Sequence, residues 1–270
     1  WYLDIVADNW DVLVQDDYTA VMPIPWRKKF FIKYVYTPLW VIQLGLYSIE
    51  VENENVFLTE LFSEFKFVEM RTNTVNSFSR FKLFQIERQL QILSLKLPYE
   101  TILTRFRKDR MRDLSKAKKY GLTEKWEYAP KNLIKLHKEN VGKRVKDFTE
   151  KEYEVLFQLI KVCVFNRKGE ILSVYDKECE LVASGFFLKH KSEIIKLISA
   201  TDFKNRKNGA NTFLIEKALF KYSKEYNFFD FGGSSIKNIA NFNLSFGAVT
   251  ENYILLKYNN LPRFLKFFKK

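Results

Sequence analysis

A chain of 270 residues of which 47% are hydrophobic can hold one large domain or two modest ones, and this composition excludes an intrinsically disordered protein. The net charge of +13 indicates attraction to polyanions, meaning nucleic acid, an anionic membrane surface or phosphorylated small molecules. Cys163 and Cys179 have no metal-ligand or disulfide spacing, and the two histidines are isolated, so neither a metal site nor a histidine-based triad is expected. No apolar run is long enough to cross a bilayer, and we expect a soluble cytoplasmic protein.

The first third of the sequence has the pattern of an antiparallel sheet. Three runs rich in β-branched and aromatic residues are separated by Asp16-Asp17 and by the basic stretch 26–29, which predicts a meander of strands joined by tight turns. A helix with apolar residues at helical spacing follows, and two more strands complete this part. The expected strands are 10–15, 18–25, 30–36, 67–70 and 90–95, and the expected helix is 56–65.

A strongly basic segment comes next. Pro98 favours the start of a long helix over 99–120, which ends at Gly121. Cations spaced three and four residues apart form one stripe along this helix, opposite an apolar face that includes Leu103 and Phe106. The stripe is either a solvated face or a surface that contacts the phosphates of RNA or another polyanion. Its residues are Arg105, Lys108, Arg112, Lys116 and Lys119.

After Gly121 the sequence alternates between strands and helices. The run 194–200 is rich in β-branched residues, and residues 214, 218 and 222 fall on one face of a helix, so a strand enters a loop that opens a helix. Near the end, residues 263–270 alternate Phe with Lys and predict a short amphipathic tail, which either packs its rings on the body or contacts a membrane. The expected order is strand 122–128, helices 132–141 and 150–165, strands 169–175, 180–188 and 193–200, strand 228–231, helix 236–246 and strand 252–258.

The loop before the helix that contains residue 214 is a candidate phosphate site. It offers cationic side chains beside a helix N-terminus, where unpaired N–H groups and the helix dipole favour an anion. In the alternative interpretation, Gly209 supplies only a tight turn and the cations are a solvated surface. The candidate residues are Arg206, Lys207, Asn208, Gly209, Ala210 and Asn211.

The order β, α, α, β, β, β, α, β, α, β over 122–258 resembles the GNAT acyltransferase fold. Residues 206–211 resemble the phosphate loop of that superfamily, Gln/Arg-x-x-Gly-x-Gly/Ala, with Asn211 in place of the last small residue. Phe-Asp-Phe-Gly-Gly-Ser at 229–234, followed by Ile239-Ala240-x-Phe242 and by Phe-Gly-Ala at 246–248, resembles the FemABX-type aminoacyltransferase branch. The basic helix before this domain is similar to that branch as well.

This resemblance implies an α/β (α+β) fold with a mixed, mostly antiparallel sheet flanked by helices. In the FemABX branch the fold is duplicated, so residues 1–97 are expected to form a smaller, truncated GNAT-like domain. Residues 98–121 would then be the basic linking helix, and residues 122–270 the complete acyltransferase domain with its tail.

The resemblance also implies transfer of an acyl or aminoacyl group to a primary amine, with a cell-envelope precursor as one candidate acceptor. The donor substrate would be acyl-CoA or aminoacyl-tRNA, with no tightly bound cofactor. Its acyl carbonyl is expected near residues 200–203, where two neighbouring strands splay apart. The helix after the fifth strand has no Tyr to act as general acid, so Asp230 is the candidate base and Tyr253 a reserve proton donor.

Both candidates also have structural interpretations. The Asp230 carboxylate could simply accept hydrogen bonds from the adjacent turn or cap the next helix. Tyr253 could be a core or rim residue. A second hypothesis is therefore a non-catalytic module whose basic helix binds RNA or another polyanion.

Overall fold

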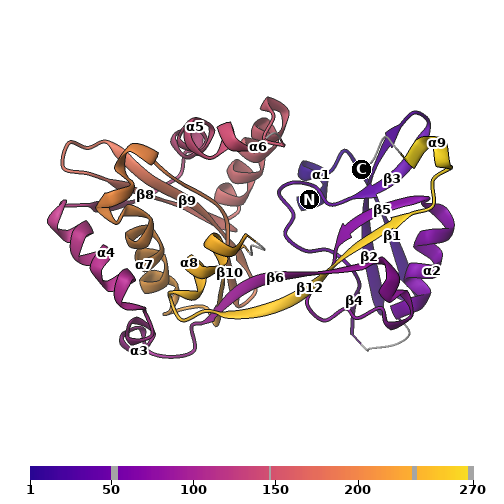
Figure 1. Cartoon of the computed structure of the whole chain (residues 1–270), viewed down its shortest axis with the longest axis horizontal. Helices are drawn as coiled ribbons and strands as arrows, with labels where there is room; N and C mark the ends of the chain where they lie inside the picture. The colour runs from indigo at the N-terminus through magenta and orange to yellow at the C-terminus, as the bar shows by residue number, and fades with distance from the viewer. Residues whose placement is uncertain (50–53, 146, 233–235, 267–270) are drawn as a thin grey trace. The chain divides into compact units, whose positions relative to one another are not determined.

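The computed structural model describes residues 1–49, 54–145, 147–232 and 236–266. The chain divides into two compact units (Figure 1). Unit 1 comprises Trp1–Gln89 and Asn252–Lys270, and unit 2 comprises Leu90–Glu251. These boundaries differ from the expected divisions at 97 and 121, because two strands cross from one unit to the other along the chain.

Unit 1 is built on the predicted antiparallel meander. Strand β2 pairs antiparallel with β1, β3 and β4, and β5 lies parallel to β3. The last strand of the chain, β12 (Val249–Asn259), lies antiparallel to β5. The helix α2 buries Phe57, Leu58 and Leu61 because these residues share one helical face. The bounds are α1 Tyr2–Val6, β1 Asn9–Gln15, β2 Ala20–Lys29, β3 Ile32–Tyr36, β4 Tyr47–Ser48, α2 Glu54–Glu64, β5 Phe67–Arg71, the 3-10 helix η1 Ser79–Phe84, and α9 Arg263–Lys266.

The turn between β2 and β3 lies further along the chain than the sequence predicted. The basic stretch 26–29 belongs to β2, where Lys28 pairs with Lys33 of β3, and the turn itself is formed by Phe30 and Phe31. Both have positive φ angles, 48° and 63°. A left-handed conformation costs an L-residue about 1–2 kcal/mol. Aromatic residues are unusual in such a turn, and the sequence pattern therefore pointed to the charged stretch instead.

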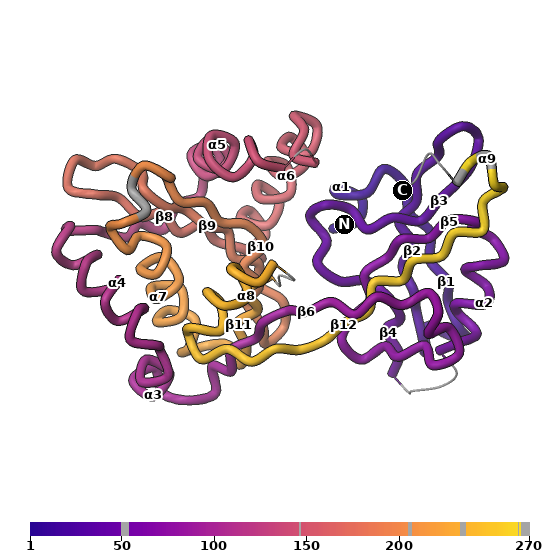
Figure 2. Tube along the Cα trace, in the orientation of Figure 1, coloured from indigo at the N-terminus to yellow at the C-terminus, as the bar shows by residue number. Residues whose placement is uncertain are grey.

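Unit 2 contains the predicted strand and helix order. Its strands lie in the order β6-β11-β10-β9-β8-β7, all antiparallel except for the parallel pair β10–β11. Figure 2 traces α4 beside α7 in this unit. The bounds are β6 Gln85–Ser94, α3 Tyr99–Thr104, α4 Lys108–Lys119, β7 Thr123–Glu127, α5 Lys131–Asn140, η2 Gly142–Arg144, α6 Glu150–Phe165, β8 Gly169–Tyr175, β9 Leu181–His190, β10 Glu193–Thr201, η3 Phe203–Asn208, α7 Ala210–Tyr222, β11 Phe228–Asp230, α8 Lys237–Leu244 and β12 Val249–Asn259.

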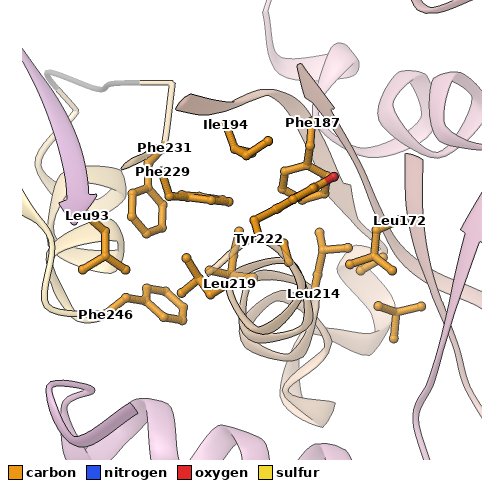
Figure 3. Packing of buried hydrophobic residues seen from close by; sticks show 14 of the residues in the cluster. Leu93, Leu172, Phe187, Ile194, Leu214, Leu219, Tyr222, Phe229, Phe231 and Phe246 are labelled. Atoms are coloured by element: carbon orange, nitrogen blue, oxygen red, sulfur yellow. The ribbon is translucent and has the colours of Figure 1, made fainter. Parts of the chain in front are cut away.

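The core of unit 2 lies between its sheet and α7. Leu214 and Ala218 are fully buried and Tyr222 nearly so, which confirms the predicted apolar face (Figure 3). Tyr222 packs edge-on against Trp126 and donates a hydrogen bond to Glu170 Oε2 at 2.9 Å, so its polar end is satisfied despite burial. Helices α5 and α6 pack on the same sheet through β8, β9 and β10. The strands that carry the candidate site are thus fixed by a dense apolar core.

The single helix expected over 99–120 is two helices, α3 and α4. They separate at residues 105–107, where the end of α8 packs against the chain. The Arg107 N–H donates to the Ser245 carbonyl at 2.9 Å, and the Arg107 guanidinium donates to the Asn241 carbonyl at 3.1 Å. These bonds cap the C-terminus of α8. A tertiary contact therefore breaks a segment that has no proline or glycine to end it.

The two units repeat one topology and exchange their last strands. In each repeat, three antiparallel strands are followed by a helix, a strand parallel to the third, a helical segment and a last strand. The first repeat runs from β1 to β6 and the second from β8 to β12. Residues 92–94 of β6 pair with β11 in unit 2, while residues 255–259 of β12 pair with β5 in unit 1. The expected duplication is thus present; α1 precedes the first repeat, and β7, α5 and α6 precede the second.

Candidate active site

Strands β10 and β11 separate at a defined point. Their parallel register runs from Glu193 and Phe228 to Ile195 and Asp230, whereas β10 continues to Thr201 beside β9. Past Asp230 the chain stays beside β6, where the Phe231 N–H donates to the Gln91 carbonyl at 3.0 Å. A β-bulge interrupts β10 between residues 196 and 198. The backbone of β10 from residue 196 onward therefore lies outside the β10–β11 ladder, and backbone groups released in this way can serve a ligand.

The predicted base, Asp230, lies at this point of separation. Its side chain is buried, with 6% of the residue exposed, and burial raises the pKa of the carboxyl group to about 6 despite an N–H bond from Gly232 at 2.8 Å. The bond to Gly232 is the turn contact that the structural interpretation of this residue expected. A carboxylate with a pKa near neutrality is also suited to accept a proton from an amine.

Lys196 is a second ionisable group at the same point, and the sequence patterns did not single it out. Burial lowers the pKa of its ammonium group to about 8, while the Asp230 carboxylate acts in the opposite direction. The ammonium lies 5.6 Å from the centre of the Phe231 ring. The signal in the sequence was a single cation inside the apolar run 194–198, where a solvated lysine would be out of place.

Two buried amide side chains lie beside the strand pair that carries Asp230. Gln91 and Asn243 are both fully buried, and Asn243 Nδ2 donates to Gln91 Oε1 at 3.0 Å. Gln91 adjoins Ile92, the residue of β6 that pairs with Asp230, and its carbonyl holds Phe231. The Oδ1 atom of Asn243 has no hydrogen-bond partner within the described part of the chain. A buried acceptor without a partner is costly unless a further group binds it.

The candidate phosphate loop is partly covered by α4. Gly209 has a φ of 84° and lies against the main-chain carbonyl of Asp113, to which a β-carbon on Gly209 would come within 2.2 Å. Asn208 and Ala210 are buried, and Asn208 Oδ1 accepts the Ala210 N–H at 2.9 Å. Lys207 is exposed, Asn211 is half-buried, and the side chain of Arg206 lies outside the described residues. The structure therefore brings the middle of this loop under a helix and leaves Lys207 at the surface.

Arg110 fixes α4 across the start of α7. Its Nη1 donates to Thr212 Oγ1 at 2.8 Å, its Nη2 contacts Asp113 Oδ2 at 3.1 Å, and Thr212 donates in turn to the same carboxylate oxygen at 3.1 Å. The guanidinium also stacks 4.8 Å from the centre of the Phe242 ring on α8. Three helices therefore meet at one side chain, which has 13% of its surface exposed.

The predicted basic stripe lies at the surface. Arg105 is exposed at the end of α3, and the other four cations are exposed on one side of α4, while Phe106 and Ala117 are buried as predicted. The helix η3 packs on α4 and adds exposed lysines beside it. The residues of this α4–η3 basic surface are Lys108, Arg112, Lys116, Lys119, Lys204 and Lys207.

Tyr253, the predicted reserve proton donor, lies half-buried on β12 in unit 1, whereas Asp230 and Lys196 lie in unit 2. Gly233 and Ser234 of the 229–234 motif are outside the described residues. Among the residues that the structure describes, no group of three or more His, Cys, Asp or Glu side chains is placed to hold a metal ion. Within the same residues, no helix combines the length and apolar character needed to cross a membrane.

No protein-family model and no curated protein sequence matches this chain. Solved structures do match it. The crystal structure of FemX aligns with 100% of this chain and 92% of its own length, at a TM-score of 0.66 and 12% identity. The chain has a FemX-type, GNAT-like fold.

Two further solved structures share the FemX-type fold. The C-terminal domain of a putative lysylphosphatidylglycerol synthetase from Agrobacterium fabrum aligns with 96% of this chain and 86% of its own length, at a TM-score of 0.63 and 11% identity. The structure of L-PGS from Bacillus licheniformis aligns with 99% of this chain and 89% of its own length, at a TM-score of 0.59 and 15% identity. Because each match covers nearly the whole chain, both repeats belong to the shared FemX-type fold.

Proposed function

We propose that this protein transfers an acyl or aminoacyl group from an activated donor to a primary amine. The observation that carries the proposal is the position of Asp230 and of Lys196 at the point where β10 and β11 separate, with the pKa of each shifted by burial toward neutrality. The FemX-type fold supports it, because the resemblance to FemABX aminoacyltransferases implies this reaction class.

The chemistry assigns one role to each group. The deprotonated Asp230 accepts a proton from the attacking amine, whose nitrogen forms the new bond to the acyl carbonyl carbon. The oxyanion that develops is stabilised by backbone N–H groups of β10 beyond Ile195 and by the Lys196 ammonium. When the tetrahedral intermediate collapses, the bond to the leaving oxygen or sulfur breaks and Lys196 supplies the proton that this atom needs. The products are an amide and an alcohol or thiol.

Aminoacyl-tRNA is the proposed donor. A CoA pyrophosphate on residues 208–210 would have to displace Asp113, whose carbonyl lies against Gly209 and whose carboxylate lies beside Thr212. A carboxylate in that place repels phosphate. The α4–η3 basic surface next to it instead offers exposed cations at intervals along a helix, which suits the phosphates of a nucleic-acid backbone. The primary amine of a cell-envelope precursor stays a candidate acceptor.

Two donors, presented separately, test this proposal. A pool of tRNA charged with radiolabelled amino acids and radiolabelled acetyl-CoA are each mixed with the protein and a cell-envelope extract, and label in amide linkage is measured. We expect transfer from aminoacyl-tRNA, and loss of that transfer in Asp230→Asn. Transfer from acetyl-CoA alone would replace the donor assignment, and full activity in Asp230→Asn would remove the catalytic role of this residue.

A second candidate function is a non-catalytic RNA-binding module. All five predicted cations are exposed, which favours this function because exposed cations can bind RNA phosphates without any catalytic group. The two functions differ in what Asp230→Asn does. A binding module would keep its affinity for tRNA and show no label transfer in either the parent or the variant.

A further inference from the structure

The tip of the β2–β3 hairpin in unit 1 presents two large apolar side chains to solvent. Phe31 is 92% exposed and Phe30 is 64% exposed, and both are held in the left-handed region at the turn. Asn-Gly is the usual choice for such a two-residue turn. Two phenylalanines at this position make the turn harder to form and the surface less soluble, and the transfer site does not involve them.

Exposed cations flank this tip on both strands. Lys28 and Lys29 precede the turn, with ammonium groups 5.7 Å and 5.6 Å from the ring centres of Phe31 and Phe30. Lys33 follows it and lies directly opposite Lys28 in the strand register. Like charges at opposed positions repel each other across a strand pair. An anionic partner would relieve this repulsion.

The apolar surface continues from the tip into a small pocket. Phe30 lines it together with Ile32 of β3 and Phe67 of β5. Leu261 and Leu265 line it from the C-terminal segment, so side chains from both ends of the unit-1 sequence meet here. Apolar groups at the tip are thus backed by an apolar recess, and Lys29 also contributes to its lining.

We propose that this tip docks on the surface of an anionic phospholipid bilayer. Phe30 and Phe31 would enter the boundary between headgroups and acyl chains, and Lys28, Lys29 and Lys33 would contact lipid phosphates. A protein partner fits less well: two phenylalanines bury at most about 300–500 Å², and a standard interface takes about 800 Å² per partner. A bilayer needs no such area, because apolar insertion and charge act together.

Vesicle binding tests this docking without reference to transfer activity. The full chain is sedimented with vesicles of phosphatidylcholine alone and with vesicles that also contain about 30% phosphatidylglycerol. We expect binding to the anionic vesicles only, weakened by added salt. In the double variant Phe30→Asn, Phe31→Gly, binding should fall at least about fivefold. Because Asn-Gly suits the positive φ angles of this turn, the variant should fold at least as well as the parent.

Phe165→Ser is the matched control, since Phe165 is 87% exposed in unit 2 and lies outside the hairpin. It should bind anionic vesicles like the parent. An equal loss in both variants would mean nonspecific adhesion, and absence of parent binding would overturn the proposal. Sedimentation equilibrium tests whether a second copy of the chain covers the tip instead. A parent protein that is dimeric, with only the Asn-Gly variant monomeric, would also overturn the proposal.

Insertion itself has a direct readout. Phe31→Trp places a fluorophore at the tip, and Phe165→Trp places one at the control position. Lipids brominated on their acyl chains should quench the added fluorescence of Phe31→Trp and leave that of Phe165→Trp unchanged. Equal quenching of the two, or quenching of neither, would contradict docking through the hairpin.

Discussion

A β-carbon placed on Gly209 would come within 2.2 Å of the main-chain oxygen of Asp113, so the start of α7 and the middle of α4 are in close contact at a point where only glycine fits. The φ of 84° at Gly209 adds a second reason for glycine. This contact covers the centre of the loop that the sequence predicted to hold donor phosphates.

Gly209→Ala should therefore lower the free energy of unfolding by at least about 1–3 kcal/mol, since α4 must shift and the backbone conformation is strained. Urea unfolding followed by circular dichroism measures this. Gly185→Ala is the control, because a β-carbon there meets side-chain atoms at 3.4 Å, ordinary contact distance, with no positive φ. Equal effects of the two substitutions would contradict close packing at Gly209.

Arg110 should matter far more to stability than its exposed neighbour Arg112. Arg110→Ala removes the cation that Asp113 and Thr212 bind, and losing this partly buried ion pair and its hydrogen bonds should cost about 2 kcal/mol. Arg112→Ala alters a solvated side chain and should cost no more than about 0.5 kcal/mol. Thermal and urea unfolding of both variants provide the comparison. Similar values would show that the contacts of Arg110 do not hold the three helices together.

Ionisation of Asp230 should reduce the free energy of unfolding as pH rises to about 6. Its folded-state pKa of about 6 exceeds the ordinary value of 3.8, so the native state binds more protons than the unfolded chain between these values. Stability contributed by this group is thus present at low pH and declines as pH rises to about 6. Asp230→Asn keeps an acceptor for the Gly232 N–H, so we expect it to raise the unfolding free energy by about 1–2 kcal/mol at pH 8. No gain at pH 8, or the same gain at pH 4, would contradict the raised pKa.

The pH dependence of transfer should be bell-shaped. The base works when Asp230 is deprotonated, above a pKa of about 6, and the acid works while Lys196 is protonated, below a pKa of about 8. Single-turnover transfer from aminoacyl-tRNA, measured across this range, should peak between these values. In Lys196→Gln, the fall of the transfer rate at alkaline pH should disappear, and most of the transfer rate should be lost. A variant that keeps this limb would exclude Lys196 as the proton donor.

The α4–η3 basic surface should determine the salt dependence of tRNA binding. Each phosphate contact contributes a log–log slope of roughly −0.7 to −0.9, so changing Arg112, Lys116 and Lys119 to Gln should make the slope shallower by about 2–3. Fluorescence anisotropy over a salt series measures this. The control changes three exposed lysines away from α4, at 161, 168 and 191, to Gln. The same change in slope for both triple variants would assign tRNA binding to net charge alone.

Most helices and strands of unit 2, and the fold type, could be predicted from the sequence. Strand 169–175 and helix 150–165 have the predicted bounds, because a long apolar periodicity and clear end signals fix such segments locally. Asp230 and the duplication were also accessible from sequence, through a motif and a resemblance. The hairpin turn was misplaced because the charged residues 26–29 have the composition of a loop, and the actual turn residues are aromatic.

Which residues lie together at the candidate site could be seen only in the folded structure. Lys196 and Asp230 are 34 positions apart, and their pKa shifts arise from burial, which no local pattern encodes. The break between α3 and α4 depends on carbonyls of α8 more than a hundred residues away. The exchange of β6 and β12 likewise depends on strand pairing across the whole chain. The sequence of a strand indicates which of its faces is buried, but it specifies only weakly which other strand it pairs with.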